Sequence, residues 1–157
     1  SSSSAASDVY KRQVQNCETN LEKFREEVEK MSQKIGFTYP RGIEVVNAPA
    51  DAGVRSHIET FQRLIEKVED NDKLYACMTY GVKPLSQILI MAIQYAYRLL
   101  DNASICCLVY GQPGWGGAAP SVNDMTALIQ MDEITRLLAE HKVKNPRTVI
   151  EKIISQD

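Results

Sequence analysis

Apolar positions in the first quarter of the chain follow a helical period. They recur at alternating spacings of three and four residues, at Val14, Cys17, Leu21, Phe24, Val28, Met31 and Ile35. This spacing is an a/d heptad stripe, and the glycine that follows it at position 36 is a common helix terminator. We therefore predict a helix over 14–35. Either this helix packs against its own domain, or the stripe joins two copies of the chain in a homodimeric coiled coil.

Two further segments carry a helical pattern. Residues 54–68 again place apolar side chains three and four apart, which predicts a second amphipathic helix. Residues 84–100 are apolar over most of the helix circumference and begin with a proline in the first turn, where a proline is tolerated. A helix of this kind is surrounded by other elements, so we place it at the centre of the fold. Between these two helices, 74–80 is predicted to be a short helix that ends at Gly81.

The second half of the chain is less regular. Residues 104–110 are apolar and partly β-branched, so they either continue the central helix or form a strand beside a short strand at 43–46. The glycines and prolines of 111–121 exclude regular structure there. Ser121 is a candidate N-cap for a fourth helix that ends near His141. The pair Asn145-Pro146 then begins a short last helix.

These elements predict a mainly α fold. We expect a single-domain helical bundle over 14–157, with four long helices, one or two short ones and a minor two-stranded element from 43–46 and 105–109. The segment SDVYKRQ resembles a translated adapter sequence left by sequence assembly. Residues 1–13 are therefore expected to be such a leader or a disordered tail. This resemblance also favours a metagenomic, microbial or mobile-element source.

Charge and cysteine content narrow the class of protein. A chain of 157 residues with a formal net charge of −2 lacks the strong positive charge of a dedicated nucleic-acid or membrane-surface binder. Its apolar runs stay below the roughly 18 residues that a membrane span needs. The four cysteines show no paired spacing, and two of them are adjacent. We therefore expect a cytoplasmic protein without disulfides.

The common motifs of cofactor and metal chemistry do not occur in the sequence. There is no Gly-Lys pair for a phosphate-binding P-loop, no GxGxxG and no HExxH. His57-Ile58-Glu59 matches only half of a zinc-deaminase signature, since the PCxxC half is missing. We therefore expect no cofactor, no metal and no enzymatic activity.

The glycine-rich loop is the first candidate for a binding site. It holds the single tryptophan, Trp115, with Tyr110 and Gln112 close before it, and large aromatics on such loops are common anchors for protein partners. Alternatively, Trp115 folds back and fills the core under its own loop. The backbone amides of 111–117 could also hold an anion, so a nucleotide-like ligand is a further alternative.

The C-terminal segment 133–154 is the second candidate. Its basic residues include Arg136, Lys142, Lys144 and Arg147, and its pattern of two helices joined by a turn resembles a helix-turn-helix unit. The small residue and glycine expected near the turn are replaced by Glu140-His141. A helical hairpin that completes the bundle is therefore the competing interpretation.

Together these observations favour a non-enzymatic protein that binds a protein partner and acts sterically. An inhibitor of a host defence system, carried by a phage or plasmid, would be one example. The alternatives are a DNA-binding regulator that uses 133–154, and a nucleotide binder that uses 111–117.

Overall fold

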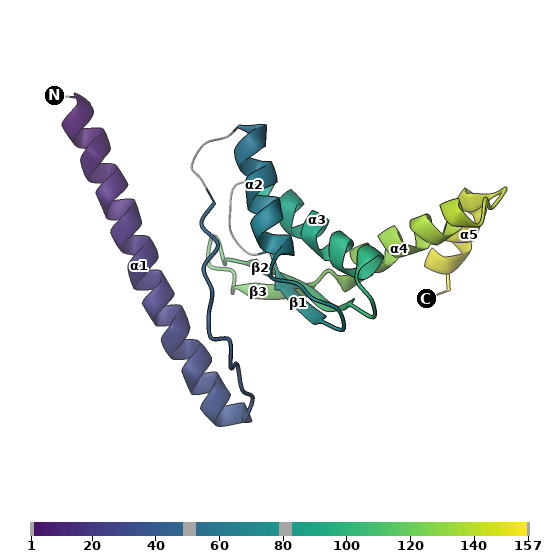
Figure 1. Cartoon of the computed structure of the whole chain (residues 1–157), viewed down its shortest axis with the longest axis horizontal. Coiled ribbons are helices and arrows are strands. Elements are labelled where there is room, and N and C mark those ends of the chain that lie inside the picture. Colours follow the sequence, from purple (N-terminus) through teal and green to yellow (C-terminus); the bar gives the residue numbers. More distant parts are fainter. Residues whose placement is uncertain (1, 49–52, 79–82, 157) are drawn as a thin grey trace. The chain divides into compact units, whose positions relative to one another are not determined.

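The computed structural model describes residues 2–48, 53–78 and 83–156, with side chains from residue 18 onward. In this part of the chain, five helices accompany one three-stranded sheet (Figure 1). The elements in chain order are α1 (Ser2–Ile35), α2 (Val54–Ile65), β1 (Lys73–Cys77), α3 (Lys83–Leu99), β2 (Ser104–Gln112), β3 (Ser121–Asp124), α4 (Thr126–Glu140) and α5 (Pro146–Ile154). The architecture is α/β. The predicted predominance of helices is confirmed, but the prediction of a helical bundle with at most a minor two-stranded element is wrong, because the sheet has three strands and helices pack on it.

The sheet has the order β1-β2-β3. β1 runs parallel to β2, and α3 forms the crossover between them. β3 returns antiparallel to β2 after a loop. The β1–β2 register shifts after Leu74, because Ile105 pairs with Leu74 while Cys107 pairs with Tyr75. Cys106 is therefore an extra residue in β2, as in a β-bulge.

Three predicted elements differ from the structure. The short helix expected at 74–80 is strand β1 as far as Cys77, and its end at 79–81 lies outside the described residues. The segment 104–110 is a strand, but its partners are β1 and β3, whereas 43–46 forms no strand. β2 also continues through Gly111 and Gln112, so the expectation of no regular structure over 111–121 is wrong at these residues. Ser121 starts β3 rather than capping a helix, and α4 begins five residues later at Thr126. The Asp124 carboxylate accepts the Thr126 backbone N–H at 2.9 Å, so Asp124 rather than Ser121 binds the first amide of α4.

The core lies on one face of the sheet. Leu108 of β2 is 0% exposed and packs with Ile93 of α3 and Ile129 of α4, so both helices cover this face. α2 packs on α3, with the rings of Phe61 and Tyr95 edge to face at 6.5 Å between centroids (Figure 1). The predicted central position of the helix over 84–100 is therefore confirmed, but it covers a sheet instead of filling a bundle.

Two asparagine turns align the starts of the parallel strands. Asn71 and Asn102 both adopt left-handed backbone conformations, with φ of 68° and 56°, which asparagine tolerates better than most residues. The Asn71 N–H donates to the Asp101 carbonyl at 2.8 Å, and the Asn102 side-chain amide donates to the Asn71 side chain at 3.0 Å. β1 and β2 therefore start side by side.

The chain divides into two compact units, Ser1–Val45 and Val46–Asp157, called unit 1 and unit 2 below. The predicted domain of 14–157 spans both units, and α1 begins at Ser2 within the segment 1–13. α1 ends at Ile35, and the following Gly36 has a φ of +86° and donates its N–H to the Ser32 carbonyl at 2.8 Å, so the predicted terminator is confirmed. Among the described residues, no helix is both long and apolar enough to cross a membrane.

Candidate functional site

The second face of the sheet carries apolar side chains that no helix of unit 2 covers within its described residues. Side chains alternate along a strand, so Tyr75, Val109 and Val122 point away from the face that holds Leu108. Tyr75 on β1 is 75% exposed and Val122 on β3 is 74% exposed. Val122 lies opposite Gly111, which has no side chain to shield it. We call the face formed by Tyr75, Cys77, Cys106, Cys107, Val109 and Val122 the open face.

Thiols occupy the middle of the open face. Cys77 and Cys106 are exposed, Cys107 is half-buried, and none of these three is in a disulfide. The bulge brings Cys106 within hydrogen-bonding reach of Tyr75, and this bond raises the pKa of the Tyr75 hydroxyl. The open face therefore combines an aromatic ring, aliphatic side chains and polarizable sulfur, which suit apolar contact. The same alternation places the charged side chains of Lys73 and Asp124 on this side of the sheet, at the start of β1 and the end of β3.

Glycines fold the loop between β2 and β3 tightly and leave its tryptophan exposed. A Cβ at Gly114 would lie 1.9 Å from the Ala118 carbonyl oxygen, so only glycine fits there. Gly116 and Gly117 have φ of +60° and +88°, which glycine adopts readily. Trp115 is 76% exposed, so the interpretation in which it fills the core is wrong.

The structure separates the three residues predicted to bind a partner. Tyr110 and Gln112 are two and four residues after Leu108 in β2, so they point to the same side of the sheet as Leu108. Trp115 lies in the loop, and Tyr75 and Val122 were not predicted from the sequence. The sequence carried little signal for β1, because the strand has only five residues and is apolar from Leu74 onward, without a polar–apolar alternation.

A polar cluster ties α3 to α4 on the covered side of the sheet. The Tyr97 hydroxyl donates to the Asp132 carboxylate, and the Arg98 guanidinium donates to the same oxygen at 2.6 Å. Next to it, a cavity of about 270 Å³ is lined by Tyr97, Ser104 and Glu133 among others. The hydrogen bond from Tyr97 and the charge of Arg98 lower the pKa of Asp132 despite its partial burial. The ionised carboxylate therefore holds the two helices together.

Asp132 should make stability depend on pH. A carboxyl whose pKa is lower in the folded than in the unfolded state stabilises the fold above its ordinary pKa, here 3.8, and this contribution is lost as the pH falls through the folded value. We expect Asp132→Asn to lower the free energy of unfolding at about pH 6, and we expect the difference from the native chain to shrink below about pH 4. Urea unfolding followed by circular dichroism across this range measures both effects.

Asp101→Asn is the matched control, because Asp101 is exposed and its contacts in the turn use backbone atoms. This variant should unfold like the native chain at every pH. If Asp132→Asn destabilised the protein equally at all pH values, the charge of Asp132 would not be the source of the stabilisation.

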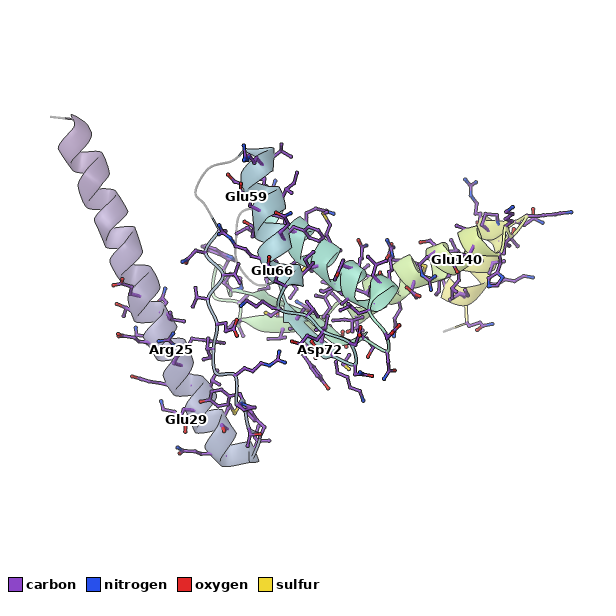
Figure 2. All side chains as sticks on the ribbon, viewed as in Figure 1. Arg25, Glu29, Glu59, Glu66, Asp72 and Glu140 are labelled. Atoms are coloured by element: carbon purple, nitrogen blue, oxygen red, sulfur yellow. The ribbon has the colours of Figure 1, made fainter. Side chains whose placement is uncertain are left out.

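Of the four basic residues of the C-terminal hairpin that were predicted to bind nucleic acid, one is already held in ion pairs. Arg136 is held by Glu133 and Glu140 on its own helix, which raises its pKa further (Figure 2 labels Glu140 near the end of α4). Lys142, Lys144 and Arg147 are exposed and form no ion pair with the described residues. Asn145-Pro146 begins α5 as predicted, with Pro146 as its first residue.

The described residues include no group of three or more His, Cys, Asp or Glu side chains that could hold a metal ion. Comparisons with models of protein families, with curated proteins and with solved structures found no match. We therefore infer the function from the geometry of this chain.

Proposed function

We propose that this chain is a non-enzymatic binding protein whose partner is another protein, and that an apolar surface of the partner packs on the open face. The observation that carries the proposal is the exposure of large apolar side chains on one sheet and its loop. Tyr75, Val122 and Trp115 are each about three-quarters exposed and belong to β1, β3 and the β2–β3 loop.

Physical reasons favour a protein partner for such a face. Leaving large apolar side chains in water costs free energy that burial would recover, at about 25 cal/mol per Å² of apolar surface. Contiguous exposed apolar patches on soluble proteins commonly mark interaction sites. The open face is also built on strands whose other side is packed by α3 and α4. Its anchors are therefore already positioned, which reduces the entropy lost on binding.

The proposed action is steric. A small protein without a cofactor site can act by covering a working surface of its partner, as inhibitors do, and an inhibitor of a host defence system carried by a mobile element remains our example. The thiols on the open face suit a reducing compartment, so we place the protein in the cytoplasm.

The two alternative functions receive less support. A DNA reader would use Arg136 for phosphate or base contacts, but two carboxylates of α4 already bind its guanidinium. A nucleotide site would need a concave cradle. Each residue from Gly114 to Pro120 is exposed, so the loop projects outward instead of enclosing a ligand.

The proposal is tested by two valine substitutions that match in type and exposure. Val122 on the open face and Val54 at the start of α2 are both 74% exposed. In pull-downs from microbial lysates, we expect the native chain and Val54→Lys to retain the same stoichiometric protein partner. Val122→Lys should lose it, because a charged side chain at a desolvated contact costs binding free energy.

Titrating the native chain and the two lysine variants with the purified partner measures the affinity of each. Equal affinities of the two lysine variants would show that the partner binds elsewhere. The DNA-binding alternative would be supported instead if the chain bound duplex DNA with an affinity that falls steeply with salt. This binding should then be lost in a double variant that combines Lys144→Ala with Arg147→Ala.

A further inference from the structure

The apolar stripe of α1 is not covered by any other part of unit 1 among its described residues. Unit 1 contains α1 and the extended segment 36–45. On the stripe, Phe24 is 58% exposed, and Met31 and Ile35 are also exposed. The side chains of Val14 and Cys17 lie outside the described residues. The interpretation in which this helix packs within its own domain therefore finds no support in unit 1.

The extended segment lies along a different flank of α1. The Ser32 hydroxyl donates to the Phe37 carbonyl at 2.6 Å, and the Tyr39 hydroxyl donates to Glu29. Arg25 and Glu29, one turn apart on α1 (Figure 2), line a cavity with Tyr39 and Ile43. Because successive helical residues are about 100° apart, Arg25 and Ser32 lie directly beside the stripe, whereas Glu29 is farther round the helix. The segment therefore borders the stripe on one side but leaves Phe24, Met31 and Ile35 exposed.

We propose that α1 pairs with α1 of a second copy of this chain in a parallel, two-stranded coiled coil. An isolated helix is marginally stable in water, and a strict a/d stripe buries its apolar side chains best against another helix of the same kind. The described a positions are Leu21, Val28 and Ile35. Two of these three are β-branched, as is common at the a positions of parallel two-stranded coiled coils.

The flanking residues are compatible with a parallel, in-register pair. A parallel, in-register pair sets every stripe residue against its own copy. It also brings Asn20 near Arg25 of the second copy, and Glu27 near Ser32, so no like charges meet. An antiparallel pair centred near residue 26 would place the two copies of Arg25 together and the two copies of Glu27 together. Antiparallel pairs shifted by one heptad leave stripe positions unpaired.

The mass of the full chain in solution tests the proposal. By sedimentation equilibrium at micromolar concentration, we expect twice the 17.6 kDa of one chain. Phe24→Lys should halve the mass, because it places a charge in the seam. Glu22→Lys is the matched control, because it introduces the same side chain two residues away on the outer surface of α1, and it should remain dimeric. A monomeric native chain, or a Phe24→Lys variant that stays dimeric, would overturn the proposal.

A cysteine substitution tests the orientation. In a parallel pair Phe24→Cys faces its own copy, so mild oxidation should form a disulfide between the two introduced cysteines, located by peptide mass spectrometry. Glu22→Cys should not form this link. A dimeric Phe24→Cys variant without the link would contradict the parallel arrangement. Val122→Lys should leave the dimer mass unchanged, so failure of the dimer and failure of the open-face proposal can be distinguished.

Discussion

Leu108→Ala should destabilise unit 2 by roughly 2–5 kcal/mol, the range found when a buried leucine is truncated. Leu108 is 0% exposed and is the residue of β2 that contacts both covering helices, through Ile93 and Ile129. Its replacement leaves a cavity between three elements that cannot all close in on it. Urea unfolding followed by circular dichroism measures the loss as a lower midpoint at an unchanged slope.

Leu128→Ala provides the matched control on the same fold. Leu128 lies in α4 next to Ile129 but is exposed, so the same truncation should change the free energy of unfolding by no more than about 0.5 kcal/mol. Equal losses in the two variants would show that α3 and α4 do not meet on β2 as described.

Trp115→Ala should weaken partner binding by about thirtyfold or more while leaving unfolding nearly unchanged. A single desolvated aromatic anchor commonly carries about 2 kcal/mol or more of an interface. Trp115 is exposed in the loop, so its removal takes little from the core. Titration calorimetry with the purified partner and urea unfolding of the free chain measure the two quantities separately.

Tyr110→Ala tests whether the partner contacts Tyr110, as predicted from the sequence, or the open face described in the structure. From the sequence we predicted that Tyr110 binds the partner together with Trp115. In the structure, the alternation of side chains along β2 directs Tyr110 to the covered side of the sheet. The affinity for the partner should therefore change little in Tyr110→Ala. If Tyr110→Ala lost binding and Trp115→Ala did not, the partner would contact the covered side.

Helices with long, regular patterns were predictable from the sequence. The period of the first stripe predicted α1 from residue 14 onward, and the sequence also predicted α2, α3 and the α5 start at Asn145-Pro146 close to where they occur. Each has either several turns of amphipathic spacing or a distinct start signal, and such signals depend on nearby residues only.

The sheet was not predictable in the same way. β1 spans five residues and β3 four, too few for a period of two to stand out from a helical reading. The pairing of β1 with β2 joins segments about thirty residues apart through α3, and no local pattern specifies it. Residues 104–110 are apolar from Ile105 onward, so they show no alternation and could be helix or strand by sequence alone.

The candidate site was predictable in one part only. Trp115 was identified because an aromatic residue between glycines is an unusual local feature. Tyr75 and Val122 were missed, since they belong to one surface only after β1 and β3 have taken their places beside β2.

The reactivity of the cysteines tests the open face most directly. Brief alkylation of the folded full chain, read out by peptide mass spectrometry, should modify Cys106 and Cys77 readily, because both are exposed on this face. Half-buried Cys107 should react more slowly. Addition of the purified partner should then protect Cys106 and Cys77. If both cysteines reacted only after the protein was unfolded, the face would already be covered in the free protein, which would contradict the proposed docking surface.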